Sequence, residues 1–190
     1  IGKVNLNIID ETAKGSDTFS KNNLLTLSLI EYFKDQKHFN VFLSIIDGKS
    51  PLSLRILDWF VTNHAKKDNI MYTNKGAQFI VYLNYKSQLK AYSKRQFDPF
   101  CRRDRITLNY DYQSGDSVAE TTLVTGTMTT TVGQLNFFRW ALINNVIDYV
   151  MENLETIEHD MYQSCRRNQN QNKKKRSASS ARKRRTELSK

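Results

Sequence analysis

The chain has 190 residues, of which 39% are hydrophobic and 11% aromatic, and this composition is sufficient for the ordinary core of a globular protein. Its formal net charge of +10 is confined to one end. Residues 166–190 carry eleven basic residues and one acidic residue, which leaves eighteen of each in residues 1–165. The sequence therefore predicts a neutral domain over 1–165 and a basic tail over 166–190, and it gives the domain no electrostatic reason to bind nucleic acid.

Cysteine spacing and hydropathy exclude several classes of protein. Neither Cys101 nor Cys165 belongs to a pair spaced for a zinc site or a redox motif. We therefore predict no metal or other cofactor, no disulfide framework and a reducing compartment. The apolar runs are much shorter than the roughly 20 residues of a membrane span, so no transmembrane segment is predicted. No signal peptide follows Ile1, and because the chain does not begin with Met we expect further residues upstream.

The first third of the chain predicts two strands and two helices. Residues 3–10 alternate apolar and polar side chains, as a half-buried strand does. A largely buried helix follows over 20–33, with a serine as its N-cap. The run 39–46 is short, apolar and rich in branched and aromatic side chains, which favours a strand. The pair Ser50-Pro51 then suits the N-cap and first turn of a helix that ends near residues 67–69.

The middle of the chain changes to an apolar spacing of two. Residues 79–85 and 105–112 are strand candidates, and the second alternates cleanly. Residues 113–116, with the sequence QSGD, predict a hairpin turn into a returning strand over 118–127. Helices, then short strands, then a long closing helix predict an α+β fold in which helices pack on a small antiparallel sheet.

The longest periodic segment covers residues 129–162. Its apolar residues recur at spacings of three and four and define one stripe of a helix: Trp140, Ile143, Ile147, Val150, Leu154, Ile157 and Met161. Such a stripe suits either a core or an interface with a second subunit. We interpret the acidic residues of this segment, with His159, as its solvated outer face rather than as a metal or acid–base site: Glu152, Glu155, Glu158 and Asp160.

The strongest functional signal is the run KKKRSASSARKRR at residues 173–185. Its composition cannot bury enough apolar surface to offset the entropy of ordering, so the tail is predicted to be disordered unless bound. Basic clusters separated by serines are typical of nucleic-acid-binding arms, nuclear localisation signals, segments that contact acidic proteins and plain solubilising extensions. The candidate binding residues are Arg166, Arg167, Lys173, Lys174, Lys175, Arg176, Arg182, Lys183, Arg184 and Arg185.

A second basic group surrounds Cys101. Arg102, Arg103 and Arg105 are candidates for a secondary contact with phosphate, or they pair with neighbouring aspartates. Adjacent guanidinium groups favour a thiolate, but a catalytic cysteine also needs a positioned base, and no histidine is near in sequence. The chain contains no P-loop, dinucleotide fingerprint, zincin helix or nucleophile elbow. We therefore predict that the protein is not an enzyme.

Three blocks of the sequence match the pattern of a known group of proteins. They are SPLSLRILDWFVTNHAKK from Ser50, RQFDPFCRRDRI from Arg95 and TTTVGQLNFFRWALINNVIDYV from Thr129. With the basic end, they resemble uncharacterised proteins of giant nucleocytoplasmic large DNA viruses, of the mimivirus or chlorovirus kind. The resemblance implies a virion or viral-factory setting, in which small non-enzymatic proteins serve as minor capsid, cement or packaging components.

These observations together define two alternative functions. The first is a non-catalytic structural protein of the virus particle, in contact with other virion proteins or copies of itself, whose tail binds DNA, RNA or an acidic partner. The second is a nucleic-acid-binding accessory factor in viral transcription or replication. The expected location is the virion and, in the infected cell, the cytoplasmic viral factory or the nucleus.

Overall fold

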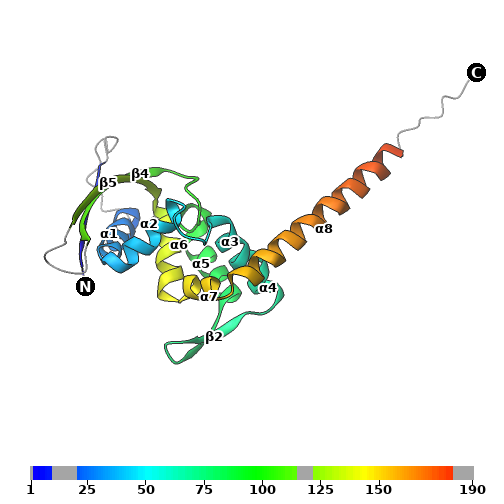
Figure 1. Ribbon diagram of the computed structural model, residues 1–190, viewed down its shortest axis with the longest axis horizontal. Helices are drawn as coiled ribbons and strands as arrows, with labels where there is room; N and C mark the ends of the chain where they lie inside the picture. The colour runs from blue at the N-terminus through cyan, green and yellow to red at the C-terminus, as the bar shows by residue number, and fades with distance from the viewer. Residues whose placement is uncertain (1, 10–20, 115–121, 182–190) are drawn as a thin grey trace, which may run out of the picture.

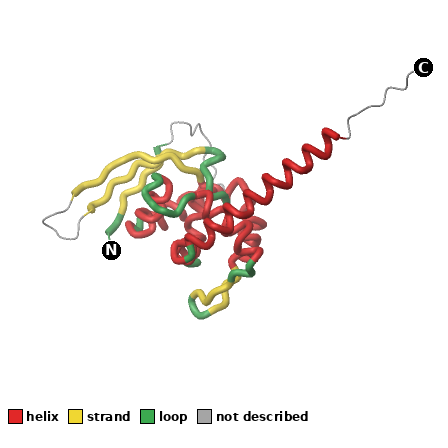
Figure 2. The backbone as a smooth tube through the Cα atoms, turned by 45° about the vertical axis from the view of Figure 1, so that its right-hand side comes forward, coloured by secondary structure: helices red, strands yellow, loops and turns green. Residues whose placement is uncertain are grey.

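The computed structural model describes residues 2–9, 21–114 and 122–181, of which residues 21–23 and 172–181 are described by their backbone alone. Helices and small antiparallel sheets make an α+β fold, as the sequence predicted. The larger sheet lies at one side of the helical body, and the last helix projects from the opposite side (Figure 1). Three strands of that sheet run beside one another over the helices (Figure 2).

The larger sheet has the strand order β1-β4-β5, and both of its pairings are antiparallel. Its strands are β1 (Val4–Ile8), β4 (Arg105–Ser114) and β5 (Thr122–Thr131). The inner face packs on the helices through Val4, Leu6, Leu108 and Met128, all of which are buried. The predicted strands at 3–10 and 105–112 are therefore confirmed. The returning strand continues to Thr131. Of the predicted turn at 113–116, Gln113 and Ser114 are the last residues of β4 and not part of a turn, and residues 115 and 116 lie outside the described part.

The N-terminal helices are α1 (Lys21–Phe33) and α2 (Gln36–Ile46), and the second corrects a prediction. The run 39–46 is helical, not a strand. Asp35 caps α2, because its carboxylate accepts hydrogen bonds from two backbone N–H groups of the first turn. Phe39 and Phe42 point to one side, where their rings lie 5.1 Å from Tyr110 of β4 and 4.9 Å from Phe138. Helical spacing of buried residues therefore prevailed over strand propensity.

The predicted helix at 50–67 is present but begins three residues later. It consists of α3 (Leu54–Trp59), the π-helix η1 (Phe60–His64) and α4 (Ala65–Lys67). Ser53, not Ser50, is the N-cap, since its hydroxyl accepts a hydrogen bond from the Ile56 N–H at 3.3 Å. The Ser50 hydroxyl accepts one from the N–H of Leu52, which places the proline in the turn before the helix.

A short hairpin and a helix replace part of the predicted sheet. The hairpin consists of β2 (Met71–Asn74) and β3 (Ala77–Ile80), and α5 (Val81–Gln96) follows at once. The strand predicted over 79–85 is therefore wrong from Val81 onward. Val81 and Tyr85 are buried at a spacing of four, and Tyr85 packs 6.0 Å from Trp140. The branched and aromatic residues of this segment favour a strand, but its packing against the helix that contains Trp140 makes it helical.

The predicted long helix is three helices. They are α6 (Val132–Ile143), α7 (Val146–Glu152) and α8 (Leu154–Ala181). Asn145 interrupts the first junction with φ 55° and ψ 26°, a left-handed conformation that asparagine tolerates. At the second junction the side chain of Asn153 donates to the Tyr149 carbonyl. The apolar stripe still faces inward, because all its residues except Ile143 and Leu154 are buried.

Helix α8 extends well past the predicted end at residue 162. Met161 is the last buried residue of its described part, and the helical backbone continues to Ala181. The sequence predicted a tail from residue 166 that is disordered unless bound, and this stays a prediction, although the backbone of 166–181 is helical here and contains neither Gly nor Pro. Residues 182–190 lie outside the described part. The division of the chain into two units at residue 165 stays a prediction.

Candidate nucleic-acid interface

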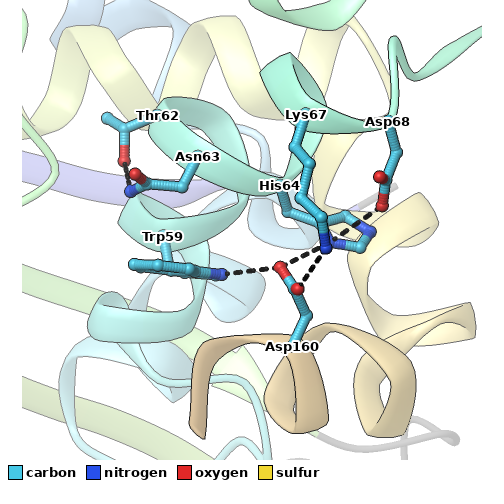
Figure 3. Close-up of polar contacts among 7 residues, drawn as sticks. All are labelled: Trp59, Thr62, Asn63, His64, Lys67, Asp68 and Asp160. Atoms are coloured by element: carbon cyan, nitrogen blue, oxygen red, sulfur yellow. Dashed lines mark hydrogen bonds and ion pairs between the residues drawn. The ribbon is translucent and has the colours of Figure 1, made fainter. Parts of the chain in front are cut away.

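Asp160 fixes the base of α8 to the body of the protein. Its carboxylate accepts a hydrogen bond from Lys67 Nζ at 2.6 Å and one from Trp59 Nε1 at 3.4 Å, and it lies 3.1 Å from Nδ1 of His64 (Figure 3). The side chains of His64 and Asp160 are 8% and 13% exposed, so this pair is largely shielded from water. A second carboxylate, that of Asp68, lies 3.5 Å from the same histidine nitrogen.

The π-helix positions the partners of Asp160. A π turn closes between residues i and i+5, as the hydrogen bond from the Ala65 N–H to the Phe60 carbonyl shows. This wider turn lets Trp59 and His64, five residues apart, reach one carboxylate from the same side of the helix (Figure 3). Lys67 is one turn further on. Three side chains of one short helical segment therefore converge on a single residue of α8.

The electrostatics of the cluster favour a charged aspartate. Burial by itself raises the pKa of Asp160, but the hydrogen bonds from Lys67, His64 and Trp59 outweigh it and hold the pKa below its ordinary value. The same contact raises the pKa of Lys67. Both oxygens of Asp160 are occupied by donors. Its chemistry is that of an anchor, which sets the direction in which α8 leaves the body.

Basic side chains gather around the point where α8 leaves the body. Arg166 and Arg167 are exposed, and Arg167 lines a shallow hollow of about 530 Å³ together with Lys67, His159 and the carboxylates of Asp68 and Asp160. A guanidinium nitrogen of Arg55, on α3, lies 3.9 Å from Sγ of Cys165 on α8. The basic character of the tail therefore begins at the surface of the body.

The predicted binding residues of the tail fall into three groups, according to whether the structure describes the side chain, the backbone alone or neither. Arg166 and Arg167 are described with their side chains. Four residues lie on the α8 backbone, with side chains outside the described part: Lys173, Lys174, Lys175 and Arg176. The last four lie beyond the described residues: Arg182, Lys183, Arg184 and Arg185. Their role in binding stays a prediction.

Of the second basic group, Arg102, Arg103 and Arg105, the first makes a contact within the body of the protein. Arg102 makes two hydrogen bonds to the carboxylate of Asp98, at 2.9 and 2.8 Å, and stacks over Phe100 at 4.7 Å. Of the two readings of this group, pairing with an aspartate is thus the one observed for Arg102. Arg103 and Arg105 are exposed. Within the described parts of the chain, none of the three arginines makes a hydrogen bond or ion pair to α8.

Sequence reasoning missed the anchor at the base of α8. Glu152 and Glu155 are exposed as predicted, but Asp160 is not part of a solvated outer face. It lies between Ile157 and Met161 on the helix, and both of these are buried. A charged residue on the flank of a buried stripe is a signal for a buried partner, although the sequence does not say which element supplies it.

The described histidines contact different polar side chains. His38 pairs with Asp35, His64 with Asp160, and His159 lies 3.5 Å from the side-chain amide of Gln163. Among residues 2–9, 21–114 and 122–181, no group of three His, Cys, Asp or Glu is placed to hold a metal ion. No helix in that part of the chain is both long enough and apolar enough to cross a membrane.

The fold and this site define a mixed α+β protein with a projecting basic helix, and comparison with known proteins places it in a family. The chain belongs to the family described as "Family of unknown function (DUF7197)", whose model matches residues 6–190. It is 36% identical over 163 residues to "Uncharacterized protein L507" of Acanthamoeba polyphaga mimivirus. That match covers 83% of this chain and 60% of the mimivirus protein, so the chain spans about three fifths of the length of that relative. No solved structure matches the chain.

These comparisons confirm the resemblance to uncharacterised giant-virus proteins that the three sequence blocks predicted. They carry no information on a capsid role, a nucleic acid or a partner protein.

Proposed function

We propose that this chain is a non-catalytic structural protein of a giant-virus particle whose basic C-terminal segment binds nucleic acid. In this proposal the body packs against other particle proteins, as a minor capsid, cement or core component does. The basic segment lies along the phosphate backbone of the genome. The protein is then found in the virion and, in the infected cell, in the cytoplasmic viral factory or the nucleus.

The separation of charge along the chain carries the proposal. Residues 166–190 hold the entire formal net charge of +10, while residues 1–165 have equal numbers of acidic and basic side chains. Contacts between Lys or Arg and phosphate release counterions and need no particular base sequence. A neutral body has no such attraction and is suited to packing against protein neighbours. In this proposal the neutral body therefore contacts proteins, and the basic segment contacts nucleic acid.

Helix α8 supports the proposal because it carries the charge away from the body. The last buried residue of its described part is Met161, and the helix continues to Ala181, which at 1.5 Å per residue is roughly 30 Å further. The anchor at Asp160 fixes where this extension starts. Figure 1 shows α8 leaving the body on the side away from the sheet. An arm of this kind lets a phosphate backbone approach without contact with the neutral body.

Salt dependence of DNA binding tests the electrostatic part of the proposal. The affinity of the full chain for duplex DNA is measured over a series of salt concentrations, beside a chain that ends after Gln171. Residues 168–171 are exposed, so this truncation leaves the contacts of α8 with the body in place. If about eight charges neutralise phosphates, log affinity falls against log salt with a slope of roughly −7, and the truncated chain loses most of that slope.

A matched pair of variants separates a specific arm from general positive charge. One variant carries Gln at the four positions 173–176, and the other carries Gln in place of four exposed lysines of the body: Lys75, Lys86, Lys90 and Lys94. Both lose four positive charges. The tail variant is expected to reduce the magnitude of the salt slope by about 3.6, and the body variant to leave it unchanged. Equal effects of the two variants, or binding insensitive to salt, reject the proposal.

Particle composition tests the structural part. Mass spectrometry of purified virions is expected to detect the protein among the particle components. Absence from particles, combined with salt-dependent DNA binding, instead identifies an accessory factor of viral transcription or replication.

A further inference from the structure

The two edges of the larger sheet differ in how they are covered. The outer edge of β1 meets the junction between α1 and α2, where the Val4 N–H donates to the Lys34 carbonyl at 2.8 Å and the Gln36 N–H donates to the Gly2 carbonyl at 3.1 Å. The outer edge of β5 meets no such element among residues 2–9, 21–114 and 122–181. Among the described residues, no main-chain hydrogen bond reaches β5 from any element other than β4 and the helix that follows β5 in the chain.

The register identifies the β5 residues whose main-chain groups face outward. The Ile9 N–H donates to the Thr107 carbonyl. The main-chain N–H and C=O groups of Thr107 and of every second residue of β4 therefore point toward β1. The main-chain groups of the other β4 residues, such as Leu108, point toward β5. These residues pair with even-numbered residues of β5, such as Met128. The N–H and C=O groups that point away from the sheet therefore belong to the odd-numbered residues of β5 before the N-cap of α6: Leu123, Thr125, Thr127 and Thr129.

This open edge has none of the usual protections against strand pairing. Natural edge strands carry Lys or other charges, Pro or a bulge, or are very short. The strand Thr122–Thr131 is ten residues long, contains no charged residue and no proline, and pairs with β4 in an unbroken register. The side chains of Leu123, Thr125, Thr127 and Thr129 are all exposed.

We propose that β5 pairs antiparallel with β5 of a second copy of this chain about a two-fold axis, which joins two three-stranded sheets into one of six strands. An isologous interface requires a surface that is complementary to itself. The uncharged strand meets this requirement, because two copies bring no like charges together. When the axis passes through Thr127, that residue faces its own copy and Thr125 faces Thr129. When the axis passes through Gly126, Thr125 faces Thr127, and threonine pairs of this kind are favourable across strands.

The same features disfavour a strongly charged partner at this edge. No charged side chain of β5 is available to pair with one, and the body as a whole is neutral. The β5 edge and α8 lie at opposite sides of the body (Figure 1). Pairing at β5 therefore leaves both basic helices free, one at each end of the dimer. The dimer and nucleic-acid binding are accordingly independent properties, and either can fail in experiment without the other.

Light scattering coupled to gel filtration of the full chain tests the proposal. The expected result is a mass that rises with protein concentration from 22.2 kDa toward twice that value. Thr127→Pro is expected to give the monomer mass at every concentration. The Thr127 N–H points outward, so proline removes no hydrogen bond within the chain, and circular dichroism is expected to match that of the wild type. The Tm is expected to match at concentrations where the wild type is monomeric and to lie below it where the wild type is dimeric.

A matched pair of lysine variants separates the edge from the face of the sheet. Thr127→Lys places a charge on the edge strand, and Asn109→Lys places one on the same face of the central strand, at the position directly opposite. The first is expected to abolish the dimer and the second to retain it. A wild-type chain that is monomeric at all concentrations overturns the proposal. It is overturned equally by a Thr127→Pro variant that is folded and still dimeric, or by equal loss of the dimer in both lysine variants.

Discussion

Oδ2 of Asp160 on α8 lies 3.1 Å from Nδ1 of His64 on the π-helix, and both side chains are largely shielded from water. These two residues are 96 positions apart in the sequence. Together with Lys67, they join the projecting helix to the helical body by hydrogen bonds and an ion pair. Because the contact lies in the last turn of α8 that holds a buried residue, we expect it to contribute both to the stability of that turn and to the direction of the extension.

Asp160→Asn is expected to destabilise the protein by about 1–3 kcal/mol at neutral pH, because the neutral amide cannot replace a carboxylate that accepts three hydrogen bonds. In a chain of this size the loss corresponds to several degrees in Tm. Thermal unfolding is the measurement. Glu155→Gln, an exposed change of the same type on the same helix, is the control and is expected to change stability by no more than about 0.5 kcal/mol.

Acid is expected to erase the difference between wild type and Asp160→Asn. The folded protein lowers the pKa of Asp160, so the stabilisation is complete above the ordinary carboxyl pKa of about 3.9 and is lost as pH falls through the folded value. The two unfolding curves should therefore converge below about pH 4. A gap in Tm that stays constant from pH 7 to pH 3 contradicts this assignment.

Asp58→Asn is expected to stabilise the protein at neutral pH, in contrast to Asp160→Asn. Burial raises the pKa of Asp58, so the charged carboxylate is penalised in the folded state at neutral pH. The amide removes that penalty, and Tm should rise at pH 7. Below the unfolded pKa both forms are neutral, and the gain should disappear. A Tm at pH 7 that falls on substitution rejects this reading of the site.

Gly133→Ala is expected to destabilise the fold by about 1–3 kcal/mol. A Cβ at Gly133 would lie 2.9 Å from the carbonyl oxygen of Arg95 and 3.3 Å from the N of Phe97, so main-chain atoms would have to move. Gly126→Ala is the comparison, because its Cβ would meet only the end of the Tyr110 side chain, which can rotate. Chemical denaturation should rank Gly133→Ala as clearly the more damaging of the two.

Asn145→Ala is expected to destabilise the protein more than Asn145→Gly. Both variants lose the hydrogen bond from the Asn145 side chain to Asn74. Only alanine also meets the steric penalty of the left-handed conformation, about 1–2 kcal/mol, at φ 55°. The difference in unfolding free energy between the variants measures this penalty. Equal stabilities would show that the break between α6 and α7 does not depend on that conformation.

Local patterns predicted the elements that carry a strong local signal. Alternation at 3–10 and 105–112 gave β1 and β4, and a dense apolar segment before Phe33 gave α1. The runs at 39–46 and 79–85 were misassigned because branched and aromatic residues favour strands on average. In the structure their side chains recur at helical spacing, against Phe138 and Trp140 of α6. Asp35, the N-cap of α2, is a local helix signal that the prediction missed.

The breaks in the long C-terminal helix depended on partners distant in sequence. The stripe from Trp140 to Met161 predicted a buried face, and that face is observed. The interruption at Asn144 and Asn145 was not predicted, since the hairpin formed by β2 and β3 stabilises it. The Tyr72 hydroxyl donates to the Asn144 carbonyl at 2.6 Å, and the Asn74 amide donates to the Asn144 side chain.

The sequence by itself determined the charge partition, the α+β class and the resemblance to giant-virus proteins, because charge, periodicity and motif are properties of residues close together in the chain. Only the tertiary structure decided which side chain meets Asp160, where α8 leaves the body and which edge of the sheet stays open. Those features depend on contacts between residues that are far apart in sequence, such as His64 with Asp160. Their positions follow from the packing of whole helices and strands, which no local pattern specifies.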